Sequence, residues 1–308
     1  MRYVFGPVHS RRLGMSLGID PVQAMTCTLD CVYCQLGKTG VQTLERRAYV
    51  PADAVIEEVQ QTIDAGATMD CITFSGTGEP TLSSELGRMI CAIRDLSRVP
   101  VVVITNSSLL HRTDVRNDLL QADLVIPSAS AIHEQVFTRL CRPLPGFDLT
   151  QMLQGLERFS RTYTGRLWVE VMLVAGVNDS EDELQALADF LNTIRCEKIQ
   201  INTVTRPPSE RACIAVDTAC LQRACQLFGQ RAEIISPAPK VAAVRCAQDI
   251  PQRITALVRS HPCTLGQICA TLGLEAAQAA AALNGLLSEG HVQKTSHKGD
   301  VFYRAFGR

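Results

Sequence analysis

Apolar and polar positions divide this chain into two regions with different patterns. In the first region, short runs rich in β-branched residues alternate with stretches in which apolar residues recur at helical spacing. Short continuous apolar runs bounded by turn residues predict buried strands, and the spacing between them predicts amphipathic helices. The apolar runs lie at 71–80, 99–108, 122–130, 167–179 and 197–208.

This alternation predicts an α/β fold with a parallel sheet, because apolar strands separated by helices are buried on both faces. We expect a first strand in MSLGIDP, residues 15–21. That gives about six βα units, enough for a partial (β/α)6 barrel of the TIM type over residues 1–245. The active residues of such folds lie where strands end, so those positions are the first place to look for a site.

The pattern changes in residues 250–308. Three helical stretches are followed by two short strands with Lys298, Gly299 and Asp300 at the tip of the predicted hairpin. A helix, a helix-turn-helix and a hairpin in this order are typical of a small winged-helix domain. The sequence therefore predicts two domains, with the larger one first.

Composition and charge narrow the possible locations and partners. The chain of 308 residues is 46% hydrophobic and 20% charged, with a formal net charge of −1. These values describe an ordinary globular protein without a general attraction to nucleic acid. No apolar run reaches the roughly 18 residues of a membrane-spanning helix, and the first residues lack the apolar block of a signal peptide. We expect a cytoplasmic protein with no membrane partner.

Three cysteines lie within eight residues, in the segment CTLDCVYC at 27–34. Cys27, Cys31 and Cys34 are an odd number of thiols, and the chain contains no second CxxC segment to complete a structural zinc site. Three closely spaced thiolates can hold three irons of a [4Fe-4S] cluster and leave the fourth open to an outside ligand. Three unrelated buried thiols are the alternative, which this close spacing disfavours.

The CxxxCxxC spacing, with the aromatic Tyr33 before the last cysteine, resembles the signature of the radical S-adenosylmethionine (SAM) superfamily. The resemblance implies a [4Fe-4S] cluster on Cys27, Cys31 and Cys34, with SAM on the fourth iron. It also implies an electron donor such as flavodoxin or ferredoxin. Reductive cleavage of SAM would give a 5′-deoxyadenosyl radical that abstracts hydrogen from a substrate.

The segment SGTGEP at 75–80 is similar to the glycine-rich segment with which this superfamily receives the methionine part of SAM. Small residues there would let backbone carbonyls approach an ammonium closely. For Asn106, Ser128 and Asn202, the alternative role is ordinary turn chemistry at the ends of strands. The resemblance implies a SAM pocket formed by Tyr33, Gly76, Thr77, Gly78, Glu79, Pro80, Asn106, Ser128 and Asn202.

The opening segment FGPVHSRRLGMSLGIDP, together with CTLDCVYCQLG, resembles the subfamily grouped with wyosine-type tRNA tricyclic-base synthases. That resemblance implies a tRNA base as one possible substrate, and a peptide or protein side chain is another. The chain departs from those synthases in having no cysteine in residues 1–26 and in its C-terminal helical region. Arg11 and Arg12 are candidate substrate-binding residues that could grip a carboxylate or phosphate, or simply a solvated surface pair.

The C-terminal region invites a rival hypothesis, a cluster-based redox or SAM sensor that regulates through its winged helix. The presumed recognition helix, 275–289, contains no Lys or Arg. Helices that read bases normally present such residues to the groove, so we do not expect specific DNA binding. We interpret the region as a docking surface.

Four further cysteines have irregular gaps, and we interpret them as structural rather than as an auxiliary cluster: Cys213, Cys220, Cys225 and Cys246.

Overall fold

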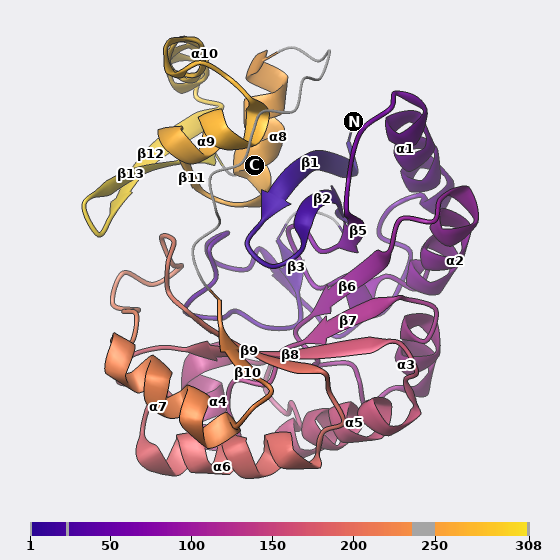
Figure 1. The fold of residues 1–308 in the computed structure, drawn as a ribbon, viewed down its shortest axis with the longest axis vertical. Helices are drawn as coiled ribbons and strands as arrows, with labels where there is room; N and C mark the ends of the chain where they lie inside the picture. The colour runs from indigo at the N-terminus through magenta and orange to yellow at the C-terminus, as the bar shows by residue number, and fades with distance from the viewer. Residues whose placement is uncertain (1, 23–24, 236–249, 307–308) are drawn as a thin grey trace.

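The computed structural model describes residues 2–22, 25–235 and 250–306 (Figure 1). Its main feature is an eight-stranded sheet in the order β1-β2-β5-β6-β7-β8-β9-β10. All neighbours from β2 to β10 are parallel, and only β1 is antiparallel to its partner. The predicted α/β fold with a mostly parallel sheet is confirmed. The strands are β1 (Val4–Ser10), β2 (Gly14–Ile19), β5 (Cys71–Phe74), β6 (Val101–Thr105), β7 (Leu124–Pro127), β8 (Arg166–Leu173), β9 (Lys198–Thr203) and β10 (Ala232–Ile234).

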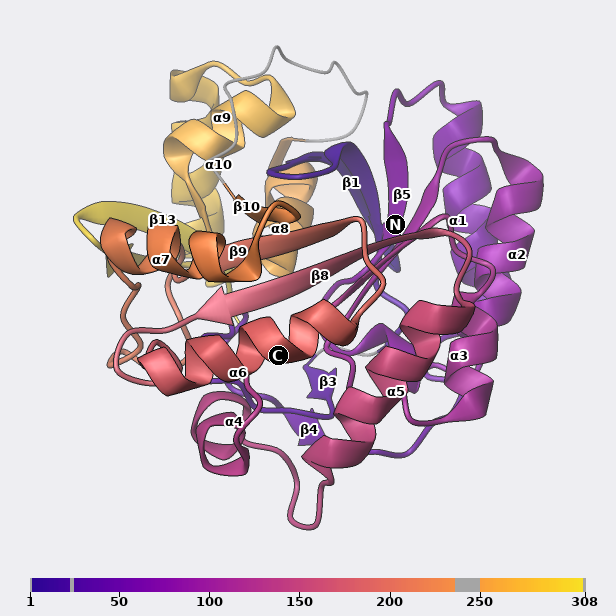
Figure 2. The ribbon, with the colours of Figure 1, turned by 60° about the horizontal axis from the view of Figure 1, so that its bottom comes forward.

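Helices surround the outer face of this sheet (Figures 1 and 2). Their apolar faces meet the strands in one core, where for example Phe74, Ile90 and Phe159 are completely buried. The strands β5 and β7 are buried at every position, which explains why they appear in the sequence as continuous apolar runs. The helices are α1 (Ala52–Asp64), α2 (Leu86–Leu96), α3 (Thr113–Leu119), α4 (Glu134–Cys141), α5 (Leu149–Thr162), α6 (Glu181–Thr193) and α7 (Thr218–Phe228).

Strand β1 was not anticipated from the sequence. Only Val4 and Val8 are buried along it, and Gly6 and Pro7 interrupt the middle, where the register with β2 shifts. Proline is tolerated in sheets mainly on edge strands, and β1 is the edge of this one. The strand therefore lacks both the alternation and the continuous apolar run that reveal strands in a sequence.

Residues 250–306 form a smaller unit with its own apolar core (Figure 1). The predicted helices and hairpin are present, and Lys298 and Gly299 turn the hairpin with positive φ angles. Thr264 and Gln267 form a reciprocal cap at the start of α9. The sheet order is β11-β13-β12, and all its pairs are antiparallel. The elements are α8 (Ile250–Ser260), β11 (Cys263–Thr264), α9 (Leu265–Leu272), α10 (Ala276–Ser288), β12 (Val292–His297) and β13 (Asp300–Ala305).

The large sheet does not close, and β1 and β10 are its two edges. The smaller unit lies against this open side of the barrel. Val8 of β1 belongs to the apolar core of the unit, and Phe5 packs against it. The hairpin reaches the opposite side, where Lys298 Nζ donates to the carbonyl of Val204 just after β9, at 3.3 Å. In the described part of the chain, no helix is long and apolar enough to cross a membrane.

Candidate functional site

A cavity of about 390 Å³ opens at the carboxyl ends of the parallel strands. It is walled by the cysteine segment, the segment after β5, the ends of β6 to β9 and the turn between β1 and β2. Thr77, Glu79 and Pro80 belong to the segment after β5 but do not line the cavity. The predicted site residues that line it are Arg11, Arg12, Cys27, Cys31, Tyr33, Cys34, Gly76, Gly78, Asn106, Ser128 and Asn202.

The cysteine segment is fixed by backbone hydrogen bonds to elements on both sides. A short strand, β3 (Thr26–Cys27), pairs with β4 (Val41–Gln42). Further on, the amide of Val32 donates to the carbonyl of Leu140 at 3.0 Å, at the end of α4. The three thiols thus face one cavity from a fixed loop, and together they do not form a site for a single metal ion.

The environment of these cysteines favours the protonated thiol. Burial raises the pKa of Cys27, and it raises the pKa of Cys34 to about 11. A hydrogen bond with Cys141, followed by burial, raises the pKa of Cys31. Thiolates are the reactive and ligating form, so these residues are inert as nucleophiles until a cationic group compensates the charge.

Asn106 joins the segment after β5 to the cysteine segment. Its side-chain nitrogen donates to Thr28 Oγ1 at 2.8 Å and lies 3.5 Å from Cys27 Sγ. Its backbone N–H donates to Glu79 Oε2 at 2.8 Å. The end of β6 is therefore tied to both of the segments that the sequence analysis assigned to cofactors.

Glu79 is buried, and its carboxylate is occupied by protein groups. Oε1 accepts from the backbone and hydroxyl of Thr81 at 3.0 and 2.6 Å, and from Thr105 Oγ1 at 2.6 Å. Burial raises the pKa of Glu79, whereas these hydrogen bonds act in the opposite direction. Through these bonds, Glu79 holds the one-turn helix η1 (Pro80–Leu82) against the end of β6.

Gly78 permits a close approach of two backbones. A Cβ at this position would lie 1.9 Å from the carbonyl oxygen of Thr26, beside Cys27. Only glycine avoids that collision, because atoms cannot approach so closely. The glycine that the sequence analysis connected with space for an ammonium is thus also needed for contact with the cysteine segment.

Asp20 lies against the segment after β5, where it contacts Gly76 and Thr77. The sequence analysis did not select this residue. Thr77 Oγ1 donates to Asp20 Oδ2 at 2.5 Å, while Oδ1 is buried and has no hydrogen-bond partner among the described residues. Burial raises the pKa of Asp20 to about 6. Gly76 has φ +109°, and a Cβ there would lie 2.7 Å from Asp20 Oδ1. The only signal in the sequence was an aspartate at the end of the expected first strand.

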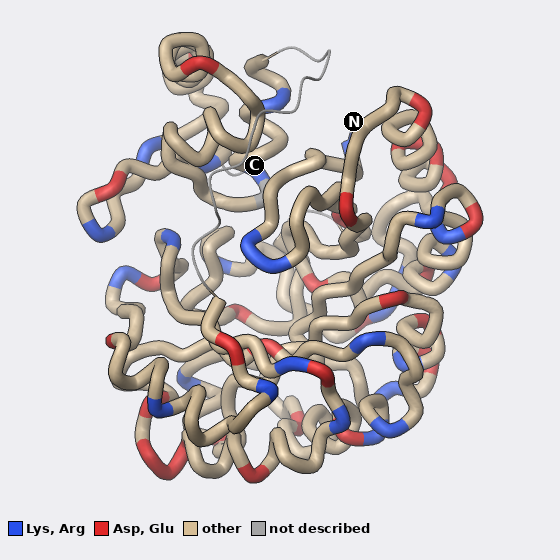
Figure 3. The backbone as a smooth tube through the Cα atoms, in the orientation of Figure 1, with Lys and Arg blue, Asp and Glu red and all other residues tan. Residues whose placement is uncertain are grey.

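Arg11 and Arg12 lie on the turn between β1 and β2, which reaches across the open side of the barrel (Figure 3). Arg12 forms a two-point ion pair with Glu170 of β8, with distances of 3.2 and 3.4 Å. Glu170 Oε1 also accepts from Asn202 Nδ2 at 2.9 Å. Burial acts against ionisation of Glu170, but Arg12 and Asn202 lower its pKa overall. Glu170 was missed from the sequence because it lies within a strand rather than at its end.

Ser128 follows β7 and donates its backbone N–H to the carbonyl of Thr105 at 2.9 Å.

Three of the four cysteines weighed as an auxiliary cluster lie in described parts of the chain, where Cys213 and Cys220 are buried and Cys225 is half-buried. No group of three potential metal ligands occurs among the described residues. Cys246 lies outside them.

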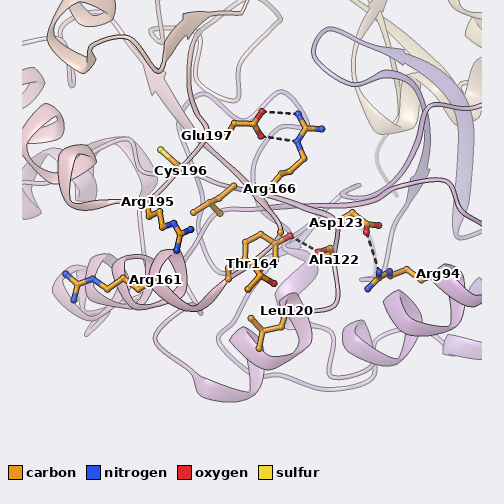
Figure 4. Close-up of a pocket in the computed structure, with 13 residues that line it drawn as sticks. Arg94, Leu120, Ala122, Asp123, Arg161, Thr164, Arg166, Arg195, Cys196 and Glu197 are labelled. Atoms are coloured by element: carbon orange, nitrogen blue, oxygen red, sulfur yellow. Dashed lines mark hydrogen bonds and ion pairs between the residues drawn. The ribbon is translucent and has the colours of Figure 1, made fainter.

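A second cavity of about 620 Å³ lies at the amino ends of β8 and β9 (Figure 4). Its charged residues are largely paired, as in the ion pair of Arg166 with Glu197 at 2.9 Å and that of Arg94 with Asp123 at 3.6 Å. None of the predicted site residues lines it. It lies on the face of a barrel that usually serves stability, so the cavity at the carboxyl ends is the candidate site.

Comparison with known proteins identifies the class. A family model described as "Radical SAM superfamily" matches residues 24–191, so the chain belongs to the radical SAM superfamily. Within that class, the chain belongs to the same family as "UPF0026 protein MJ1312" of Methanocaldococcus jannaschii. The two are 32% identical over 309 residues, covering 98% of this chain and 96% of that protein.

Two further proteins show similarity of different kinds. A protein named "GTPase Obg" from Brachyspira hyodysenteriae is 34% identical over 97% of this chain, which spans only 45% of that protein's length. The crystal structure of a radical SAM methyltransferase from Sphaerobacter thermophilus has a TM-score of 0.53 at 17% identity. The aligned part covers 71% of this chain and 65% of that one, which shows a shared fold. The radical SAM family uses a [4Fe-4S] cluster and SAM, as the resemblance in the sequence implied.

Proposed function

We propose that this protein is an enzyme that binds a [4Fe-4S] cluster through Cys27, Cys31 and Cys34 and cleaves SAM reductively. The observation that carries the proposal is the cavity at the carboxyl ends of the strands, which all three cysteines share with Asn106 and Gly78. When bound, the cluster and SAM supply a 5′-deoxyadenosyl radical that removes a hydrogen atom from a substrate.

The residues present fit this cofactor pair. Each of three irons needs one thiolate, so the cysteines need not converge as ligands of a single ion do. Asn106 offers a hydrogen-bond donor toward Cys27 Sγ, and such donors tune iron–sulfur centres. In this proposal Tyr33, Gly76, Gly78, Asn106, Ser128 and Asn202 line the SAM pocket. Thr77, Glu79 and Pro80 would support it from behind, because they do not line the cavity.

We further propose two domains, a catalytic partial barrel at 1–245 and a winged-helix domain at 250–308. The order helix, strand, helix, helix, hairpin and the sheet order β11-β13-β12 support the second assignment. Because this domain packs on β1 and lies against the open side of the barrel, its proposed role is to close the catalytic cavity and to help bind substrate. Chain composition supports a cytoplasmic location, where flavodoxin or ferredoxin would supply electrons.

The sensor hypothesis is not favoured. Helix α10 (Ala276–Ser288) carries no Lys or Arg, and glutamates flank it at 275 and 289. A helix of this composition is poorly suited to a DNA groove. The substrates implied by the resemblance, a tRNA base or a peptide side chain, belong to the enzyme hypothesis.

The test is a cleavage assay with anaerobically reconstituted full-length protein, SAM and dithionite. We expect 5′-deoxyadenosine and methionine in equal amounts, together with about four irons per chain. Replacing Cys27, Cys31 and Cys34 by alanine should abolish both the product and the iron. Cys91→Ala, at an exposed position on α2, is the matched control and should change neither. Four irons in the triple variant would refute the assignment.

A further inference from the structure

Four charged side chains line the catalytic cavity, and three of them are arginines. Arg11 and Arg12 come from the β1–β2 turn, Arg206 follows β9, and Glu170 is the acidic member. Glu170 is already engaged in the two-point ion pair with Arg12. Among the described residues, Arg11 and Arg206 form no ion pair, which leaves an excess of positive charge in the cavity.

The hydrogen bonds of these two arginines leave donors available. Arg11 donates to Thr205 Oγ1 at 3.3 Å and to Asn202 Oδ1 at 3.4 Å. Arg206 donates to Gln35 Oε1 at 3.0 Å. A guanidinium carries five N–H donors, so these neutral partners use only part of its capacity and none of its charge.

Arg11 and Arg206 are both half-buried in the wall of this cavity, and the charge of Arg206 acts on Arg11. Burial, and then the charge of Arg206, lowers the pKa of Arg11 to about 10. Burial also lowers the pKa of Arg206. Two like charges that share a half-buried site are unfavourable unless a counter-ion joins them. The arrangement therefore has the electrostatics of a site prepared for an anion.

Two histidines complete this part of the cavity. His9, near the end of β1 and two residues before Arg11, has a buried Nδ1 without a hydrogen-bond partner among the described residues. Buried polar atoms are normally paired, so an unpaired one in a cavity wall suggests that a ligand supplies the partner. His261 comes from the C-terminal unit, where burial and then the charge of Arg206 lower its pKa. The site thus lies between the barrel and that unit.

We propose that Arg11 and Arg206 form an anion-binding site that holds the carboxylate or phosphate group of the substrate. This inference rests on the proposed function, because it gives the chemical class of the substrate that shares the cavity with the cluster. Guanidinium groups match the planar, two-oxygen edge of such anions better than an ammonium does. Arg12 is not part of the pair, since Glu170 neutralises it.

The test measures anion binding in reconstituted full-length protein without reductant, so that no turnover takes place. Inorganic phosphate and acetate are titrated separately at constant ionic strength, and binding is followed through the midpoint of thermal unfolding. We expect one of the two anions to raise the midpoint, which tells a phosphate substrate from a carboxylate one. Arg11→Met and Arg206→Met should each weaken that binding at least tenfold.

Arg158→Met is the matched control, because Arg158 is exposed on α5 and its side chain donates to Gln154 Oε1 on the same helix. It should keep the wild-type response. Arg206→Lys keeps the charge and loses the planar fork, so it should fold normally and weaken binding by a smaller factor than methionine. This variant keeps the experiment informative where the methionine variant does not fold.

Three outcomes overturn the inference. In the first outcome, neither anion stabilises the wild-type protein. In the second, the arginine variants respond to the anion as the wild type does. In the third outcome, the same variants weaken SAM binding by the same factor, which would make the anion the carboxylate of the cofactor. Each outcome is separate from failure of the proposed function, which is judged by 5′-deoxyadenosine formation alone.

Discussion

The side-chain nitrogen of Asn106 lies 3.5 Å from Cys27 Sγ, while the backbone N–H of the same residue donates to Glu79 at 2.8 Å. The two contacts point to two different partners, a thiol in the cysteine segment and a carboxylate in the segment after β5. One position at the end of β6 therefore sets the separation between the proposed cluster ligand and the proposed cofactor loop.

Asn106→Ala should lower the reduction potential of the cluster. The substitution removes the donor to Cys27 Sγ, and hydrogen bonds to cluster sulfurs favour the reduced, more negative state. The backbone bond to Glu79 is retained, so iron content should stay near that of the wild type. A redox titration followed by electron paramagnetic resonance checks the shift. Asn117→Ala, exposed on α3, is the control, and an unchanged potential in Asn106→Ala would contradict the assignment.

Gly78→Ala should destabilise the fold by roughly 1–3 kcal/mol, the usual range for overpacking. Its Cβ would meet the carbonyl oxygen of Thr26, a backbone atom that cannot rotate away. Urea unfolding measures the change. Gly285→Ala is the control, since nothing lies within 4 Å of a Cβ there and the glycine is inside α10. That control should be stabilised by about 0.5–1 kcal/mol. Equal stability of Gly78→Ala and the wild type would show that the two segments are not in contact.

Asp20 should make the stability of the protein fall as pH rises. Burial raises its pKa from 3.8 to about 6, so between these values the folded state keeps a proton that the unfolded state has lost. The loss should begin near pH 4, be complete above pH 6, and amount to at most about 3 kcal/mol. Asp20→Asn carries no titrating group and should lack this component. If the unfolding free energies of the wild type and of Asp20→Asn depend on pH in the same way, Asp20 is not a buried carboxyl group with a raised pKa.

Ile254→Ala should lower the stability of the whole protein by about 2–5 kcal/mol. Ile254 is completely buried in the core that the C-terminal unit shares with Val8 of β1, so loosening this core should affect the barrel too. Calorimetry should show a single transition that moves to lower temperature. Val301→Ala, at a position 45% exposed, is the control and should change little. Two separated transitions would mean that the units unfold independently.

Local patterns were sufficient for the parts of the fold that are buried on both faces. The strand at 101–105 is a run of β-branched residues ending in Asn106, and its place in the sequence already indicated both a strand and a strand-end residue. Spacing alone was likewise enough to bring the three cysteines to one loop. Strand β1 escaped prediction because Gly6 and Pro7 interrupt it and only part of it is buried.

The remaining site residues depend on contacts between distant segments, which no local pattern contains. Arg206 and His261 are separated by 55 positions and meet at the cavity only because the C-terminal unit folds back over the barrel. Gly78 shows another limit. The sequence marked it as a position for a small residue, but the atom it must avoid, the carbonyl of Thr26, became evident only from the packing of two loops.

The apolar contact of β1 with the C-terminal unit also determines when the protein can finish folding. The ribosome makes Val8 nearly 250 residues before Ile254 and Leu257, which belong to the same apolar core. A chain still in synthesis therefore carries an apolar strand edge that stays uncovered until residues 250–306 have left the ribosome. We expect such late, long-range closure to slow folding and to leave apolar surface of the nascent barrel exposed to aggregation.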